Sequence, residues 1–456
     1  MTFGGKVLKI HPTGLILFSF LLAIMVGTFL ISLPWATVQG HINLVDALFT
    51  ATSAVCVTGL VVVDTGSFFT LFGQIVILGL IQIGGLGVMT ISVFLFRWMG
   101  RGISIRHRMA MQDVFAHTPR EDILGLVRSI IYFTLTAELL GAIVLTSQWA
   151  DDFGFHKAIY YAGFHAISAF CNAGFSTFSD SMTRFGDDTI LNLTVCGLII
   201  AGGVGFPVIH ELRVWLKMRG GRRPRLSVQT KTVIWTTLLL IVAGALLFFL
   251  LENPNSMQGT SIQHKMLASL FQSVTCRTAG FNTVNIGSLQ DATLALMIFL
   301  MFFGASPGSC GGGVKTTTLA LLTAFTWSRI KRHQRVNIFK KSIPQETVTR
   351  TMSLMLVSIG IIGLVLFLLL LVDSAIGYEA DAPRGVFLTY FFETVSAFGT
   401  VGLSMGITSQ LSTWGKLWIT VMMIVGRVGV LTFAYIVVGA GTSTGIEYSE
   451  ENMMVG

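Results

Sequence analysis

The stretch Leu48-Phe-Thr-Ala-Thr-Ser-Ala-Val-Cys-Val-Thr-Gly59 occurs four times in this sequence in related forms. The other copies are Gly163-Phe-His-Ala-Ile-Ser-Ala-Phe-Cys-Asn-Ala-Gly174, Leu270-Phe-Gln-Ser-Val-Thr-Cys-Arg-Thr-Ala-Gly280 and Phe391-Phe-Glu-Thr-Val-Ser-Ala-Phe-Gly-Thr-Val-Gly402. The third copy is one residue shorter between its Phe and its Gly, and Leu or Phe follows the Gly in all four. A sequence that recurs at intervals indicates one structural unit used several times.

A second glycine motif follows each of these stretches inside a long apolar run. It reads Gly84-Gly-Leu-Gly87, Gly202-Gly-Val-Gly205 and Gly426-Arg-Val-Gly429, and in the third unit it is replaced by the polar segment Gly304-Ala-Ser-Pro-Gly-Ser-Cys-Gly-Gly-Gly313. The first Gly of this element lies 24 to 28 residues beyond the Gly that ends the preceding stretch. This regular spacing predicts four units, which we place at residues 1–105, 106–222, 223–340 and 341–456.

The composition is that of a membrane protein. Of the 456 residues, 53% are hydrophobic and 11% are charged, whereas a soluble domain carries about 25% charged residues. Lipid offers no partner to backbone polar groups, so the long apolar runs must be helices. Eight spans are predicted: Leu15–Leu33, Ile75–Phe96, Ile130–Leu145, Ile190–Ile209, Val233–Leu251, Leu294–Phe303, Leu354–Val372 and Leu417–Val438.

The repeated stretches themselves are too short to cross a bilayer and are expected to be re-entrant. These four segments are residues 43–57, 157–171, 263–276 and 384–398. A re-entrant segment survives at membrane depth only where protein buries it or where it lines a wet cavity. The expected fold is therefore an all-α polytopic membrane protein. Its four helix–pore-loop–helix repeats supply eight transmembrane helices and four re-entrant pore helices around a pseudo-four-fold pore.

The net charge of +8 follows the positive-inside rule and does not indicate nucleic-acid binding. Most Lys and Arg residues lie in four segments, at 6–9, 97–120, 217–231 and 329–350, which we expect in the cytoplasm together with both termini. The five cysteines have neither metal-ligand spacing nor the even number of a disulfide framework. No clustered nucleophile and base, metal ligands or paired carboxylates support an enzyme.

The glycines that end the repeated stretches are expected to form a cation filter. A pore that selects a dehydrated cation needs backbone carbonyls in stacked rings, and glycine permits the backbone conformations this requires. The short helices before the turns would aim their negative C-terminal ends at the axis. The alternative is that these glycines only let helices pack closely. The predicted pore turns are 57–62, 172–177, 277–283 and 399–405, and the filter residues are Val57, Thr58, Gly59, Asn172, Ala173, Gly174, Thr278, Ala279, Gly280, Thr400, Val401 and Gly402.

The polar segment 304–315 is expected to interrupt the second long helix of the third unit, and only that helix. A flexible loop beneath the filter would be a barrier whose movement opens the path. Arg427, at the depth where two other units have glycine, is expected to contact the carbonyls of this loop and to oppose cation leakage. The alternative is a structural ion pair or a snorkelling side chain. The predicted gate residues are Gly304, Ala305, Ser306, Pro307, Gly308, Ser309, Gly311, Gly312, Gly313, Lys315 and Arg427.

The sequence resembles the Trk/Ktr/HKT superfamily of K+ transporters over nearly all of residues 10–440, and most resembles the KtrB-type membrane subunits of Ktr systems. The resemblance is carried by Val57-Thr-Gly-Leu60, Asn172-Ala-Gly-Phe175, Arg277-Thr-Ala-Gly-Phe281 and Phe398-Gly-Thr-Val-Gly-Leu403. It implies a K+ filter centred on Gly59, Gly174, Gly280 and Gly402, with the loop and Arg427 as the gate. A Gly in the first turn goes with K+ selectivity in this superfamily, and a Ser there goes with Na+ transport.

The resemblance also implies partners and a location. It implies a homodimer in the bacterial cytoplasmic (inner) membrane and a cytosolic nucleotide-binding regulatory subunit, a KtrA-like ring. K+ is then the transported ion and Na+ the expected activator, nucleotide binds only the partner subunit, and no covalent cofactor is expected. The alternative function is a cation-coupled secondary K+ or Na+ transporter. Such carriers usually show inverted repeats and broken helices in both halves, whereas these four repeats share one orientation.

Overall fold

The computed structural model describes residues 12–87, 123–217, 225–376 and 385–433, and nearly all of its regular structure is helical. Each unit has a long first helix, a short helix that ends at one of the repeated glycine turns, and a second long helix. The first helices are α1 (Pro12–Ile31), α7 (Ile123–Phe153), α11 (Val228–Glu252) and α15 (Gln345–Ile376). The short helices, called pore helices below, are α2 (Leu44–Val55), α8 (Phe155–Phe170), α12 (Ile262–Thr275) and α16 (Val386–Gly399).

The second long helices are α4 (Leu71–Leu86), α9 (Thr189–Gly203), α13 (Asp291–Phe302) and α17 (Thr413–Val428). Further elements are α3 (Thr65–Phe68), α10 (Phe206–Lys217), α14 (Thr316–Ile330), four 3₁₀ turns η1–η4 (Pro34–Ala36, Thr183–Phe185, Ile286–Ser288 and Thr408–Gln410) and a two-stranded hairpin of β1 (Asn337–Ile338) and β2 (Lys341–Ser342). The pore helices lie within a few residues of their predicted bounds. The expectation of an all-α polytopic membrane protein with pore-loop repeats is confirmed.

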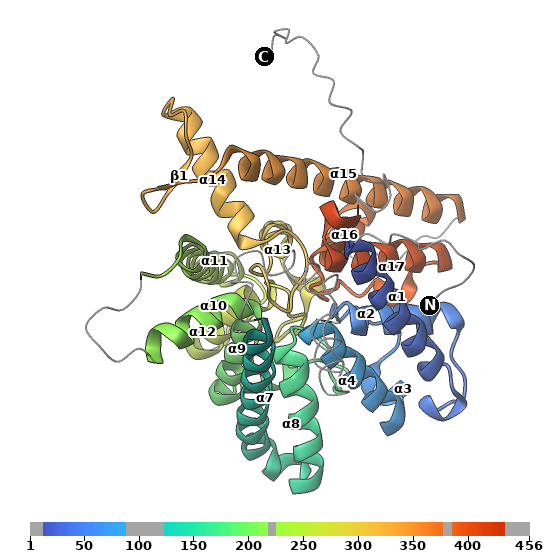
Figure 1. Ribbon diagram of the computed structural model, residues 1–456. Coiled ribbons are helices and arrows are strands. Elements are labelled where there is room, and N and C mark those ends of the chain that lie inside the picture. The colour runs from blue at the N-terminus through green and yellow to red at the C-terminus, as the bar shows by residue number, and fades with distance from the viewer. Residues whose placement is uncertain (1–11, 88–122, 218–224, 377–384, 434–456) are drawn as a thin grey trace.

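The four units follow one another around a common centre, as the colour sequence of Figure 1 shows. The second long helix of each unit packs against the pore helix of the next one: α4 against α8, α9 against α12, and α13 against α16. The ring closes where α17 packs against α2. There Lys416 Nζ lies 2.7 Å from Asp46 Oδ1, and both side chains are largely buried. The four pore helices are thus held side by side by the same kind of contact.

Helix length separates two classes among the described helices. By length and composition alone, three helices could cross a membrane, at Val127–Phe153, Val228–Glu252 and Gln345–Val372, and the bent pair α9–α10 would make a fourth. All three are first helices of their units. The second helices are shorter. Those of the first, second and fourth units end within the second glycine motif, and α13 ends at Phe302, just before the polar segment that replaces this motif.

The expectation that only the third unit has a broken helix is wrong. The chain bends by 98° between α9 and α10, so the predicted span Ile190–Ile209 is not one helix. Gly205 has φ +99° there, and the equivalent Gly87 and Gly429 have φ +81° and +96° at the ends of α4 and α17. A left-handed glycine ends a helix by turning the next residue out of the hydrogen-bond ladder. The last Gly of the second glycine motif is the sequence feature that could have predicted these helix ends.

Several sequence-based expectations lie outside the described residues. They include the basic segment 97–120, both chain termini, and the boundaries at residues 105 and 222. The division into four units at those boundaries and the cytoplasmic placement of the termini stay predictions.

Glu252 fastens the outer end of the third unit. Its carboxylate is buried and accepts hydrogen bonds from Gln290 N at 2.9 Å, Thr293 Oγ1 at 2.5 Å and Asn255 Nδ2 at 2.8 Å. We expect Glu252→Ala to lower the free energy of unfolding by about 2–4 kcal/mol, because several buried donors would lose their acceptor together. Thermal unfolding of the purified protein in detergent measures this. The exposed Asp152→Ala is the control, and equal melting temperatures for the two variants would contradict the assignment.

Candidate functional site: the pore turns and the loop beneath them

The pore turns share one backbone conformation. The first residue of each turn, Val57, Asn172, Thr278 or Thr400, has φ between +50° and +72°. The residue two positions later is the repeated Gly, with φ between +69° and +93°. A positive φ is costly for a residue with a side chain, and for β-branched Val and Thr above all, so the surrounding structure must hold it. A backbone that alternates positive and negative φ turns successive carbonyls toward one side, as a cation-coordinating ring requires.

The four glycines form a closed ring. A Cβ on Gly59 would lie 2.4 Å from Ala173 O, and one on Gly174 would lie 2.8 Å from Ala279 O. A Cβ on Gly280 would lie 2.5 Å from Val401 O, and one on Gly402 would lie 2.1 Å from Thr58 O. Each glycine therefore lies against a carbonyl of the next turn, that of the residue just before the glycine of that turn. The fourth glycine contacts the first turn, which closes the ring. The alternative that these glycines only let helices pack does not explain contacts between four turns.

Sequence analysis missed the hydroxyls that hold the turns. Ser53 and Ser396 accept hydrogen bonds from Gly59 N and Gly402 N, both at 3.1 Å. In the other two units the hydroxyl donates instead, from Ser168 to Phe175 O at 2.7 Å and from Thr275 to Phe281 O at 2.6 Å. These residues stand five or six positions before the Gly in every repeat. A Ser or Thr at this matching position in all four stretches is the sequence feature that could have predicted these bonds.

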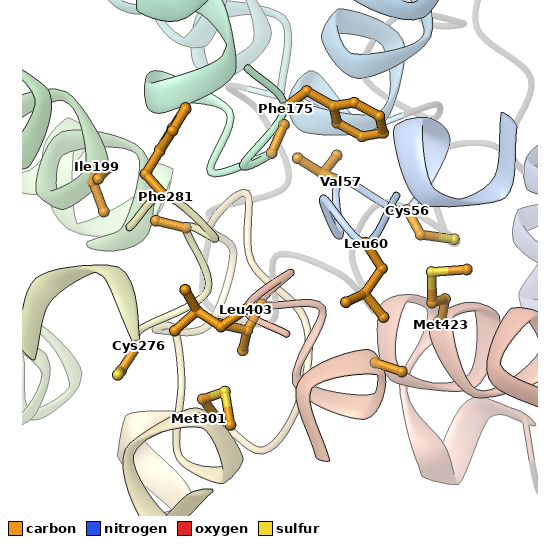
Figure 2. Close-up of a cluster of buried hydrophobic side chains, with 14 of the residues drawn as sticks. Cys56, Val57, Leu60, Phe175, Ile199, Cys276, Phe281, Met301, Leu403 and Met423 are labelled. Carbon is orange, nitrogen blue, oxygen red and sulfur yellow. The ribbon is translucent and has the colours of Figure 1, made fainter. Parts of the chain in front are cut away.

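Apolar side chains surround the ring. The residues after the four glycines, Leu60, Phe175, Phe281 and Leu403, are all buried. Figure 2 shows them around a common centre, each coming from a different segment of the chain. This apolar packing surrounds the turns and excludes water from behind them. The C-terminal ends of the four pore helices lie at the same place, and their partial negative charge favours a cation there.

The loop from Gly304 to Lys315 lies directly below the third and fourth turns. Gly312 N donates to Thr400 Oγ1 at 2.8 Å, and a Cβ on Gly311 would lie 2.1 Å from Thr278 Oγ1. Lys315 Nζ donates back to the loop, to Gly311 O at 2.6 Å and Gly312 O at 3.2 Å. Lys315 therefore fixes the loop from its own end.

The same loop supplies hydrogen-bond donors to the broken helices. The last carbonyls of a helix have no partner within the helix. Ser306 N and Cys310 N donate to Gly203 O and Gly202 O, at 3.1 and 3.2 Å, at the end of α9. Gly313 N donates to Gly426 O at 3.1 Å, near the end of α17. The loop thus replaces the donors that the helix breaks remove.

Arg427 completes this arrangement for the first unit. Its Nη2 donates to Gly84 O near the end of α4, and its Nη1 donates to Cys310 O in the loop. The expected contact between Arg427 and the loop carbonyls is therefore present. Arg427 has no salt bridge to a carboxylate among the described residues, so the structural ion pair is not observed there. Its positive charge lies beside the carbonyl of Cys310 in the loop.

The structure brings all the predicted site residues together in two layers. The non-glycine filter residues Val57, Thr58, Asn172, Ala173, Thr278, Ala279, Thr400 and Val401 are all buried in the turns. The loop residues and Arg427 form the layer below them. Glu138 lies behind the second turn and accepts a hydrogen bond from Gln82 Nε2 at 3.2 Å.

The sequence matches the TrkH family of cation transport proteins over residues 28–440. The chain belongs to the TrkH family. Membership confirms the expectation of a multi-pass transport protein and not an enzyme. The four-fold ring of glycine turns lies entirely within the matched region of this TrkH-family chain.

Two relatives of this TrkH-family chain match over most of their length. It is 41% identical to Ktr system potassium uptake protein B of Vibrio alginolyticus over 97% of this chain and 94% of the relative. It is 38% identical to the Bacillus subtilis protein of the same name over 94% of each chain. Among solved structures, it resembles the potassium transporter TrkH from Vibrio parahaemolyticus, with a TM-score of 0.69 at 20% identity, over 95% of this chain and 86% of the other. At that identity the last comparison shows the fold alone.

The ring predicts that Gly402 does not tolerate a side chain. Gly402→Ala places a Cβ 2.1 Å from Thr58 O at φ +93°, so we expect cation uptake to fall more than about tenfold. Gly79→Ala is the matched control, because Gly79 lies inside α4 with nothing within 4 Å of its Cβ position. Uptake by cells with equal surface amounts of both variants measures the effect. Equal uptake by the two variants would show that the ring tolerates a side chain.

Proposed function

We propose that this chain is the K+-translocating membrane subunit of a Ktr-type K+ uptake system and works like a channel. The observation that carries the proposal is the closed ring of four left-handed glycines, each beside the carbonyl of the next turn. Carbonyl rings replace the hydration shell of a cation without a formal negative charge, which suits a monovalent ion. The two Ktr potassium uptake relatives support K+ as that ion.

In this proposal, K+ binds at the carbonyls of the turns at Val57–Gly59, Asn172–Gly174, Thr278–Gly280 and Thr400–Gly402. The loop below closes the path, and Arg427 opposes cations there. Since the loop donates to the ends of α9 and α17, it can leave only if those carbonyls gain other partners, such as water. Opening therefore exchanges one set of hydrogen bonds for another.

The finer parts of the proposal concern regulation and assembly. We propose a homodimer in the bacterial inner membrane, controlled by a cytosolic nucleotide-binding subunit of the KtrA type and stimulated by Na+. The name of a Ktr system supports a partner subunit, since both relatives are called components of one. The hairpin β1–β2 and the first turns of α15 carry basic side chains such as Lys341 and Arg350 that could meet such a partner.

Coupled secondary transport is the alternative. Alternating-access carriers usually have broken helices in both halves of the chain. In this chain a helix is interrupted in the second unit as well as in the third. Here, however, the breaks stand at equivalent positions around one axis and converge on one loop. We therefore keep the channel-like path as the proposal.

The proposed filter predicts that a side chain added at Gly59 changes the ion preference. Gly59→Ser should lower the preference for K+ over Na+, because a Cβ 2.4 Å from Ala173 O displaces the carbonyl ring. K+ and Na+ uptake by a bacterial strain without its own K+ uptake systems measures this preference. The wild-type chain should restore growth at low K+. A wild-type chain that reaches the membrane and moves no K+, with its regulatory subunit present, would reject the function itself.

The gate proposal predicts a gain of flux. Arg427→Gln removes the positive charge beside the loop and weakens its bonds to Cys310 O and Gly84 O, so uptake should rise. A barrier lowered by about 1 kcal/mol gives roughly fivefold faster uptake. The exposed Arg332→Gln is the control for charge alone. Unchanged or slower uptake by a well-expressed Arg427→Gln would assign Arg427 a structural role.

A further inference from the structure

One polar residue occupies the same place in all four pore helices. It follows the Phe of the repeated stretch. It stands three residues before the Ser or Thr whose hydroxyl holds the turn, which we call the tether hydroxyl (Ser53, Ser168, Thr275 and Ser396). The four residues are Thr50, His165, Gln272 and Glu393, and all are buried. A buried polar group costs free energy unless it is hydrogen-bonded, so the partners of these side chains indicate their purpose.

Three of these side chains reach the segment beyond the filter glycine. His165 Nδ1 lies 2.7 Å from Tyr161 O, which only accepts, so in the neutral ring Nε2 accepts from Ser176 Oγ at 3.0 Å. Ser176 stands two residues after Gly174. Gln272 Nε2 donates to Thr283 Oγ1 at 3.5 Å, three residues after Gly280.

Glu393 makes the corresponding contact in the fourth unit. Its Oε1 accepts a hydrogen bond from Thr408 Oγ1, whose hydroxyl also lies 3.0 Å from Ser404 Oγ. Ser404 stands two residues after Gly402. We call the residues just after the glycine the outer limb of the turn. In the second and third units the side chain from the pore helix bonds the outer limb directly, and in the fourth unit Glu393 connects to Ser404 of the outer limb through the Thr408 hydroxyl.

The first unit is different. Thr50 Oγ1 donates to Asp46 O within its own helix, at 2.8 Å. The segment beyond Gly59 is held farther along by Gln74 of α4, whose Nε2 donates to Gly66 O at 3.1 Å and Phe69 O at 2.9 Å. The connection from pore helix to outer limb is thus present in three turns. The first unit lacks it, although Thr50 stands at the equivalent position.

We propose that His165, Gln272 and Glu393 are positioning residues that set the ion preference of the filter. A carbonyl ring discriminates between cations only if it resists closing around the smaller one. Each of these turns is tied at two points, by a hydroxyl bonded to the glycine or to the residue directly after it and by the side chain that reaches farther along the turn. A turn tied at two points resists that closure better than a turn tied at one. This inference rests on the proposed filter function.

The fourth unit offers the sharpest test because both partners can be changed. Glu393→Leu removes the acceptor, and we expect the preference for K+ over Na+ to fall about tenfold, as for the loss of one buried hydrogen bond. Thr408→Val removes the donor and should have the same effect, and the double variant should be no worse than either. Glu393→Gln keeps an acceptor at Oε1 and should retain the preference to within about twofold.

Two controls separate positioning from general loss of stability. Thr394→Val changes the next residue of the same helix, whose buried hydroxyl donates to Tyr390 O within that helix. Thr50→Val changes the equivalent position in the first unit, where the hydroxyl also bonds its own helix. Both should keep the wild-type ion preference.

The measurement is Rb+ uptake against increasing Na+ by full-length chains with their regulatory subunit, at matched surface amounts. If Glu393→Leu does not reach the membrane, Thr408→Val carries the same test from the outer limb. Wild-type ion preference in surface-expressed Thr408→Val, or reduced uptake with unchanged preference in Glu393→Leu, would overturn the inference. Failure of the wild-type chain to take up Rb+ would instead reject the filter function.

Discussion

The need to satisfy backbone groups at membrane depth governs this structure. Four irregular turns meet around one centre, and four second helices stop beside them, at a depth where lipid offers no hydrogen bonds. Contacts within the protein stabilise this arrangement. The tether hydroxyls hold the turns from behind, the apolar residues after the glycines exclude lipid, and the loop of the third unit covers the helix ends.

Departure from four-fold symmetry is what makes this loop possible. If all four second helices ended alike, each would leave free carbonyls and none would supply donors. The third unit replaces its helix end by a glycine-rich segment whose N–H groups point to Gly202, Gly203 and Gly426. The first unit receives no such bond and is served by the guanidinium of Arg427. The hydrogen bonds that satisfy these helix ends are thus the same bonds that hold the proposed gate. Under that proposal, any change that opens the path must also replace donors at three helix ends.

The two layers differ in how firmly they are held. The filter turns are fixed by short side-chain bonds from their own pore helices and by tight contact between glycines. The loop is held by hydrogen bonds to other units, and it contains Gly308 and Gly313 with φ +70° and +65°. A ring held by its own pore helices above a loop held by neighbouring units agrees with the proposed division into a filter and a gate.

The sequence by itself determined the number of pore helices, their bounds and the glycines of the ring, because a four-fold internal repeat reports equivalent positions without any structure. It also located the interrupted third helix and singled out Arg427, since five glycines and a charge are conspicuous in an apolar run. Tertiary structure alone decided what those residues touch. The helix ends at Gly87, Gly205 and Gly429 were not predicted, because glycine within an apolar run is equally compatible with a continuous helix and only the φ value distinguishes the two. The partners of Arg427, Ser53 and Glu393 lie in other segments or beyond a turn, and local sequence does not encode which distant carbonyl or hydroxyl will stand within 3 Å.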